Sequence, residues 1–218
     1  EAYATLQGSG HAQAFCFGCH TVNELGNAVD TAAGWNKVQD EAYHDVQCES
    51  CHGPGETHVT TPDASAAPLA SIKADTGAGG AGTCAECHTG VHHPYVEQWR
   101  ASRHFNFHLS SATTAPGTCE ACHEARGVLK RWQVTSNYIE KNDVVTAGNA
   151  IGITCAVCHD PHGNDNPGHL RLPIDEPTLD GNLCMSCHSR RFELTAANSS
   201  PHGPHGASLL GTAGWWPS

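Results

Sequence analysis

The chain has 218 residues, with 11 basic and 22 acidic residues and a formal charge of -11 at neutral pH. This charge disfavours nucleic acid and anionic membranes as partners and favours a partner with a basic docking patch. Aromatic residues make up 6% of the chain, and it has one methionine, 23 glycines and 12 prolines. Such a chain has little side-chain material from which to build an ordinary core.

Regular secondary structure is expected to be sparse. Residues 60–82 are rich in Ala, Gly, Ser and Pro and predict a loop or linker. A helix is predicted from about Pro94 to Phe105, with Pro94 at a first helical position. A second is predicted over Glu124–Trp132, although Gly127 weakens it. No segment shows convincing strand alternation, so the sequence predicts a mostly irregular chain with short α-helices and little or no β-structure.

All twelve cysteines fall into six copies of Cys-x-x-Cys-His. This pentapeptide is the attachment motif of c-type haem, because two thiols three residues apart form thioethers with the two porphyrin vinyl groups and the next imidazole meets the iron. The predicted attachment residues are Cys16, Cys19, Cys48, Cys51, Cys84, Cys87, Cys119, Cys122, Cys155, Cys158, Cys184 and Cys187. The predicted proximal ligands are His20, His52, His88, His123, His159 and His188.

Three other interpretations of the cysteines explain less. A zinc site built from Cys-x-x-Cys pairs does not need a histidine directly after each pair. A thioredoxin-like redox pair would be a single motif beside a βαβ pattern, and here there are six motifs without that pattern. A disulfide framework gives no account of the six histidines. We therefore predict six covalently bound haem c groups.

The motif histidines follow one another at steps of 32, 36, 35, 36 and 29 residues. Because the haems would supply most of the material to pack around, we expect residues 1–218 to form a single elongated, haem-packed domain. We also expect the haem-free chain to be largely unfolded.

The sixth coordination position of each iron decides between carrying electrons and small-molecule chemistry. Of 17 histidines, eleven lie outside the motifs, so there are enough of them to give each of the six irons a second imidazole ligand. Met185 lies between two haem-bearing cysteines and is poorly placed to reach an iron. Bis-histidine ligation at low potential is therefore predicted, since a methionine ligand raises the potential.

Sequence context selects six distal candidates. Leu6-Gln-Gly-Ser-Gly-His11 and Trp99-Arg-Ala-Ser-Arg-His104 share an apolar residue, a small residue, Ser and His at the same offsets. Other candidates lie just before or after a motif or in the repeated Pro-His-Gly near the C-terminus. The predicted distal ligands are His11, His44, His58, His104, His162 and His202. Solvated side chains are the favoured interpretation of His92, His108 and His169, while His92, His93 and His205 stay open as replacements.

Three strings carry a family resemblance: His44-Asp-Val-Gln-Cys-Glu-Ser-Cys-His-Gly-Pro-Gly-Glu-Thr-His58, Ser-Gly-His11-Ala and Cys-His-Asp-Pro-His-Gly. They resemble the multihaem c-type cytochromes that include the tetrahaem cytochromes of ammonia oxidisers, loosely from about Tyr3 to Gly211. The resemblance implies electron transfer through closely stacked haems, a mostly helical and irregular fold, and export before haem attachment. It also implies distal histidines in contexts that match His11, His44 and His104. Six haems depart from the tetrahaem pattern, so haem order and ligand pairing do not carry over.

Thioether attachment takes place on the outer side of the cytoplasmic membrane, so the protein is expected to be exported: extracellular or at the cell surface, alternatively periplasmic. No charged and apolar leader precedes Glu1, and we expect this chain to be the mature product. No apolar run approaches the length of a membrane span, so no transmembrane segment is expected. The apolar tail, residues 209–218, is expected to cover a haem edge or to dock on another subunit.

Three functions follow. The leading one is electron transfer to redox partner proteins or extracellular acceptors, with self-association into a filament as its elaboration. The second is a soluble periplasmic electron shuttle. The third is an enzyme of nitrogen-compound redox chemistry, which needs an open iron. No motif has a lysine in place of its histidine and spare histidines abound, so the protein is not expected to be an enzyme.

Overall fold

The computed structural model describes residues 2–9, 13–22, 41–61, 67–75, 83–106, 119–176 and 181–188. Over these residues the chain is mostly irregular, with short helices and no strands. Two isolated antiparallel bridges, Thr21 with His44 and His159 with Leu170, are its β-type pairings in the described segments. The predicted fold class is confirmed.

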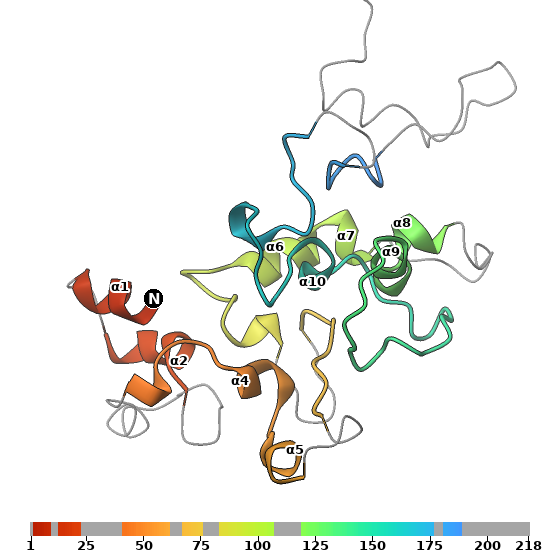
Figure 1. Ribbon diagram of the computed structural model, residues 1–218. Coiled ribbons are helices and arrows are strands. Elements are labelled where there is room, and N and C mark those ends of the chain that lie inside the picture. The colour runs from red at the N-terminus through yellow and green to blue at the C-terminus, as the bar shows by residue number, and fades with distance from the viewer. Residues whose placement is uncertain are drawn as a thin grey trace, which may run out of the picture.

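The helices of the described segments are all short, and the longest of them have seven residues. The α-helices are α1 (Ala2–Gly8), α2 (Phe17–His20), α4 (Cys48–His52), α5 (Glu56–Thr60), α6 (Tyr95–Ala101), α7 (Arg103–Asn106), α8 (Glu120–His123), α9 (Ala125–Arg131) and α10 (Cys155–Cys158). Short 3-10 helices cover Ala14–Cys16, Glu41–Tyr43, Cys84–Glu86 and Pro167–His169. In Figure 1, α1 and α2 lie at one end of the molecule, α8 and α9 lie at the other, and α4, α6 and α10 lie between them.

The prediction of one continuous helix from about Pro94 to Phe105 is wrong. It is two helices, α6 and α7, separated at Ser102, whose backbone is extended with φ -83° and ψ 164°. Pro94 precedes the first helical residue instead of occupying it. His104 therefore lies on α7 and not on a continuation of α6.

The helix predicted over Glu124–Trp132 is confirmed as α9, one residue shorter at each end. Glu124 is its N-cap, because the carboxylate accepts a hydrogen bond from the backbone N–H of Gly127 at 3.1 Å. Gly127 weakens the helix only in isolation. A Cβ at this position would lie 2.3 Å from the backbone oxygen of Glu120, so the glycine allows α9 to pack directly on α8.

The largest apolar cluster among the described residues joins α9 and α10 to the segment 67–75. Its buried members are Ile72, Ala125, Val128, Leu129, Tyr138, Ile151 and Val157. Residues 60–82 were predicted to be a loop or linker, and the described part beyond Thr60 has no helix or strand. The linker interpretation is wrong for 67–75, however, because Ile72 and Ala74 are buried. The apolar residues Ile72 and Ala74 alternate with polar ones over too few positions to predict burial in a segment flanked by Gly and Pro.

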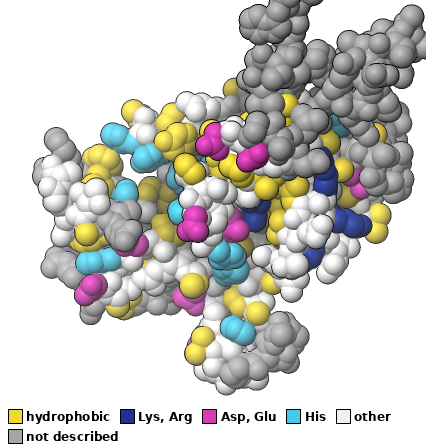
Figure 2. Space-filling model, turned by 45° about the horizontal axis from the view of Figure 1, so that its top comes forward, with side chains coloured by type: hydrophobic (Ala, Val, Ile, Leu, Met, Phe, Trp, Pro, Cys, Tyr) yellow, Lys and Arg dark blue, Asp and Glu magenta, His cyan; other side chains and the backbone are white. Residues whose placement is uncertain are grey.

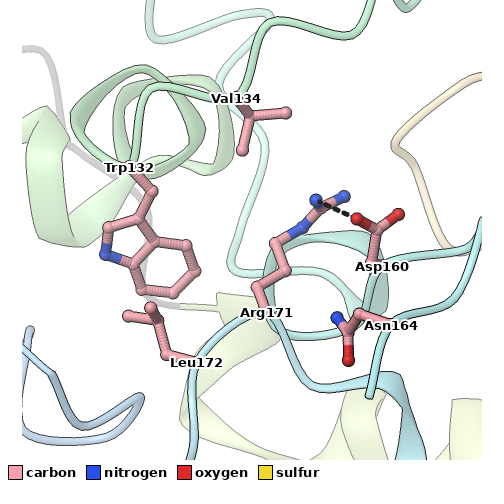
Figure 3. Close-up of a pocket in the computed structure, with 6 residues that line it drawn as sticks. All are labelled: Trp132, Val134, Asp160, Asn164, Arg171 and Leu172. Carbon is pink, nitrogen blue, oxygen red and sulfur yellow. Dashed lines mark hydrogen bonds and ion pairs between the residues drawn. The ribbon is translucent and has the colours of Figure 1, made fainter. Parts of the chain in front are cut away.

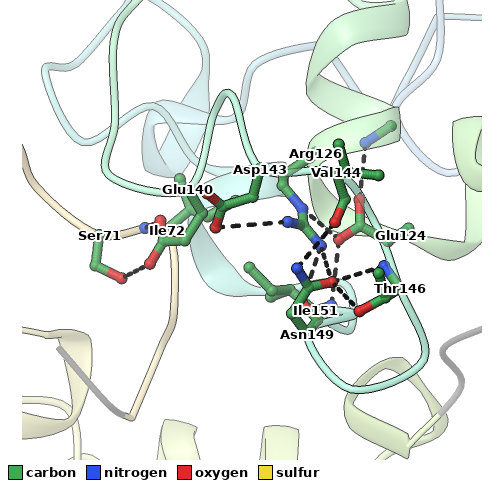
Figure 4. A network of polar contacts seen from close by, with 11 residues as sticks. Ser71, Ile72, Glu124, Arg126, Glu140, Asp143, Val144, Thr146, Asn149 and Ile151 are labelled. Carbon is green, nitrogen blue, oxygen red and sulfur yellow. Dashed lines mark hydrogen bonds and ion pairs between the residues drawn. The ribbon is translucent and has the colours of Figure 1, made fainter. Parts of the chain in front are cut away.

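A polar network lies beside this cluster (Figure 4). The Glu124 carboxylate is fully buried and accepts hydrogen bonds from the Arg126 Nε at 2.8 Å and from the Ile151 backbone N–H at 3.2 Å. Arg126 also donates to the backbone oxygen of Asn149 at 2.9 Å. On the other side, Glu140 accepts a hydrogen bond from the backbone N–H of Ile72. The network therefore ties 119–151 to the segment that contains Ile72.

The N-terminal end is assembled differently. Tyr3 is 4% exposed, its backbone N–H donates to Asp45 Oδ1 at 2.7 Å, and its ring stacks on His44 with centroids 3.7 Å apart. Phe17 lies against the same tyrosine at 6.1 Å. These ring contacts place His44 beside α1 and α2. Among the described residues, no helix has both the length and the apolar character needed to cross a membrane.

Candidate haem site

Each Cys-x-x-Cys-His motif is folded as about one helical turn. The histidine N–H donates to the carbonyl of the first cysteine in the third, fourth, fifth and sixth motifs, at 2.8, 3.0, 2.8 and 2.9 Å. In the first two motifs the turn forms part of α2 and α4. Side chains three and four residues apart share one helix face, so both thiols and the imidazole are presented together. No disulfide joins any of the twelve cysteines, all of which lie in the described segments.

Two motif histidines are oriented as metal ligands are. Nδ1 of His52 is 2.8 Å from the backbone oxygen of Pro68, and Nδ1 of His159 is 2.6 Å from that of Gly168. With Nδ1 as the donor, Nε2 is left as the ligand atom. Metal-binding histidines usually donate their other N–H to such an acceptor, which fixes the tautomer and the ring direction. The residues therefore fit covalent haem with an axial imidazole.

Motifs that are far apart in the sequence contact one another. The Cys19 thiol is 3.8 Å from the backbone oxygen of Cys87, which joins the first motif to the third. A hydrogen bond between the Cys84 and Cys155 thiols joins the third to the fifth. It raises the pKa of Cys84 and lowers that of Cys155 to about 7.

The fourth and sixth motifs also touch. Arg131 of α9 donates to the Cys122 sulfur at 3.5 Å and to the backbone oxygen of Ser186, between the two cysteines of the sixth motif. A hydrogen bond to Cys122, followed by burial, raises the pKa of the Cys187 thiol. Burial and then the nearby Cys184 raise the pKa of Cys158 to about 11, so the sixth motif also lies near the fifth.

Two predicted distal ligands hold buried nitrogens without a hydrogen-bond partner: Nε2 of His44 and Nδ1 of His58. A buried ring nitrogen without a partner is costly unless something binds it, so both positions suit iron ligands. The backbone of His44 pairs with Thr21, immediately after the first motif, while its sequence neighbour is the second motif. It thus lies between two attachment sites.

Three pairs of imidazoles lie at similar separations; the ring planes are 24° from parallel in the first pair and meet at 61° and 79° in the other two. The ring centroids are 6.1 Å apart for His52 and His162, 6.1 Å for His104 and His188, and 6.2 Å for His88 and His93. Each pair combines a motif histidine with a histidine outside the motifs. Burial first, and then the neighbouring His93 and His159, lower the pKa of His88.

Of the remaining histidines outside the motifs, some lie in the described segments and some do not. His11 and His202 lie outside the described residues, as do His108 and His205. His92 stacks on Phe15 at 5.6 Å, and His169 makes local hydrogen bonds with Asn164. In the described segments no group of three or more His, Cys, Asp or Glu side chains is arranged to hold a metal ion.

Sequence reasoning missed a pocket that borders the fifth motif (Figure 3). It has a volume of about 290 Å³ and is lined by Trp132, Val134, Asp160, Asn164, Arg171 and Leu172. Arg171 crosses it to reach Asp160 at 3.2 Å and also donates to the backbone oxygen of Ala156 on α10 at 3.0 Å. Arg171 lies twelve residues beyond the motif histidine, and nothing in its sequence context indicates this contact.

Comparisons with known proteins point in one direction. Residues 145–192 match the doubled CXXCH motif family, and residues 2–53 match the cytochrome c554 and c-prime family. The chain is 25% identical over 199 residues to the C-type polyheme cytochrome OmcB from two strains of Geobacter sulfurreducens. The match covers 80% of this chain and spans about a quarter of that relative. The crystal structure of the outer cell wall cytochrome OcwA matches with a TM-score of 0.45 and 23% identity, over 80% of this chain and 43% of that one.

Proposed function

We propose that this chain, a multihaem c-type cytochrome, transfers electrons through six haems whose irons each have two histidine ligands. The observation that carries the proposal is the contact between attachment motifs. The first motif touches the third, the third touches the fifth, and the fourth touches the sixth. Since each motif holds its porphyrin within a few bonds of its thiols, these contacts bring the first, third and fifth haems close together and the fourth close to the sixth.

The haems supply one-electron oxidation and reduction when bound. The protein's part is to fix their distance and orientation and to set their potentials through ligands, burial and hydrogen bonds. Arg131 holds the fourth motif against the sixth, and Pro68 and Gly168 orient two proximal imidazoles. Each of these residues therefore acts on the route rather than on a substrate.

The number and ligation of the haems are tested directly. The intact mass of the purified protein should correspond to six haems, and electron paramagnetic resonance should show low-spin iron throughout. Five haems, or a high-spin iron in the wild type, would contradict the proposal. The second outcome would instead favour the enzyme alternative, because small-molecule chemistry needs an open coordination position.

The route is tested by removing one haem. The fifth motif touches the third and lies near the sixth, so Cys155→Ala/Cys158→Ala should divide the remaining haems into two groups. We expect wild-type haems to be reduced in one stopped-flow phase and the variant's haems in two separate phases. Cys48→Ala/Cys51→Ala is the matched control, since it also leaves five haems. A single phase in the fifth-motif variant would show that the route does not pass through that haem.

We further propose that the protein is exported and assembles end to end, as a subunit of an extracellular conducting filament. The first motif, on α2, and the fourth, on α8, lie at opposite ends of the molecule in Figure 1, which supports a route along its length. A head-to-tail contact that does not close into a ring generates a filament. Negative-stain microscopy of the native, as-secreted protein should show filaments. Discrete particles would support the soluble shuttle.

A further inference from the structure

We propose that His52 and His162 are the two axial ligands of one iron, that of the second haem, and that Asp160 and Arg171 position His162 for this role. The inference rests on the proposed function and adds a specific pairing to it. His162 follows the fifth motif, so the fifth attachment loop would supply the distal ligand for the second haem.

The separation of the two rings fits a shared iron. A metal–imidazole bond is about 2.0–2.1 Å long, and a ring centre lies about 1.1 Å from its own nitrogen when ring bonds are about 1.33 Å. Two imidazoles on opposite sides of one iron should therefore have centroids about 6.3 Å apart. The centroids of His52 and His162 are 6.1 Å apart, with ring planes 24° from parallel.

The second nitrogen of each ring faces an acceptor. Nδ1 of His52 lies 2.8 Å from the backbone oxygen of Pro68. Nδ1 of His162 lies 3.8 Å from Asp160 Oδ1, and the backbone N–H of His162 donates to the same oxygen at 3.1 Å. Nε2 is thus the ligand atom on both sides. A carboxylate behind a metal-bound histidine is a common arrangement, and it makes the imidazole a stronger donor.

Asp160 is itself held in place. Arg171 contacts its other oxygen, Oδ2, at 3.2 Å and is anchored to α10 through Ala156. Figure 3 shows Arg171 pointing across the pocket to Asp160. The arginine therefore links the fifth motif's helix to the carboxylate that orients His162.

Ring separation alone does not identify a ligand pair, and His88 with His93 shows why. Their centroids are 6.2 Å apart, but five residues span at most about 17 Å. That is less than the path from one porphyrin face, around its edge and back over the other face. His52 and His162 are distant in the sequence, so no such limit applies to them. His104 and His188, also 6.1 Å apart, pass the same test.

The pairing is tested in the haem-loaded protein by counting spin states. His162→Ala should convert one iron to high spin, and added imidazole should restore low spin if the fold is intact. In a Cys48→Ala/Cys51→Ala background the same substitution should produce no high-spin iron, because the haem that it affects is missing. In a Cys184→Ala/Cys187→Ala background the high-spin iron should remain. His169→Asn is the matched control on the same loop, because Asn also tolerates the positive φ at this position.

Two results would overturn the pairing. Six low-spin irons in His162→Ala would remove His162 as a ligand, and a high-spin iron that persists without the second haem would assign it to another iron. Asp160→Asn should keep all irons low-spin and raise the potential of one of them, while an unchanged set of potentials would refute the positioning role. A wild type with fewer than six haems would contradict the proposed function before these comparisons are made.

Discussion

Two regions of the molecule are stabilised by different means. The N-terminal block, meaning the described residues from 2 to 61, buries only Tyr3, Phe17 and Val22 among its large hydrophobic residues and relies on ring contacts to a histidine. The central block, residues 67–75 and 119–157, has a seven-residue apolar cluster and a buried carboxylate–guanidinium pair. The central block has the beginnings of a protein core, whereas the N-terminal block gathers groups that suit haem.

Charge follows the same division. The first 72 residues contain one lysine and nine acidic residues, so they account for -8 of the formal charge of -11. On the face shown in Figure 2, histidines spread over the left and centre while Lys and Arg gather toward the right. A partner with a basic docking patch would therefore be attracted to the N-terminal third.

The largest expected effect comes from removing haem altogether. A chain expressed without haem attachment should lose amide-exchange protection throughout the N-terminal block, because its few buried side chains do not offset the entropy of ordering. Residual protection should be confined to 119–157. Hydrogen exchange with mass spectrometry, with circular dichroism alongside, makes the measurement. Protection of the N-terminal block that matches its protection in the haem-loaded protein would show that this block folds without haem.

Breaking the buried pair should be the next largest effect, and it should be confined to the central block. Glu124→Ala leaves the guanidinium of Arg126, 5% exposed, without its close carboxylate partner, at a cost of about 3–5 kcal/mol. Local opening free energies from hydrogen exchange should fall in 119–157 and stay unchanged in the N-terminal block. The double variant Glu124→Leu/Arg126→Met should lose less than the single one, since it removes both charges. Exposed Glu97→Ala is the control.

The sequence predicted the fold class correctly but not every element within it. The Cys-x-x-Cys-His motifs are local patterns, so the haem-attachment residues can be predicted from the sequence alone. The helix break at Ser102 and the burial of Ile72 could not, because both depend on contacts with residues about fifty or more positions away, such as the Trp99 indole N–H that donates to the Ile153 backbone oxygen. The pairing proposed for His162 and His52 could not be predicted from the sequence for the same reason. The one sequence feature that indicates a role for Asp160 is its position between the two histidines of Cys-His-Asp-Pro-His, where it is one of two intervening residues.

Gly127→Ala should produce a smaller loss in the central block. The added Cβ would lie 2.3 Å from a backbone oxygen of α8, and backbone cannot move aside as a flexible side chain can. Overpacking of this kind costs about 1–3 kcal/mol, although alanine itself favours the helix. Exchange should accelerate at the α8–α9 contact. Gly148→Ala is the matched control, because its nearest neighbour, Thr146 Oγ1, is 4.0 Å away. Equal losses in both variants would remove close packing as the reason for the glycine.

The smallest expected effect comes from comparing the two copies of a short sequence repeat, which contain Ser9 and Ser102. The sequence repeat that singled out His11 and His104 has the same geometry in its described part. Ser9 Oγ and Ser102 Oγ each donate at 2.6 Å to a carbonyl three residues earlier, at the ends of α1 and α6.

Only the surroundings of the two serines differ, because the first bond is exposed and the second is partly buried. Ser102→Ala should cost about 0.5–1.5 kcal/mol, measured as exchange at the end of α6, and Ser9→Ala should cost less because water replaces its bond. Equal costs would mean that the protein packs around the two copies alike.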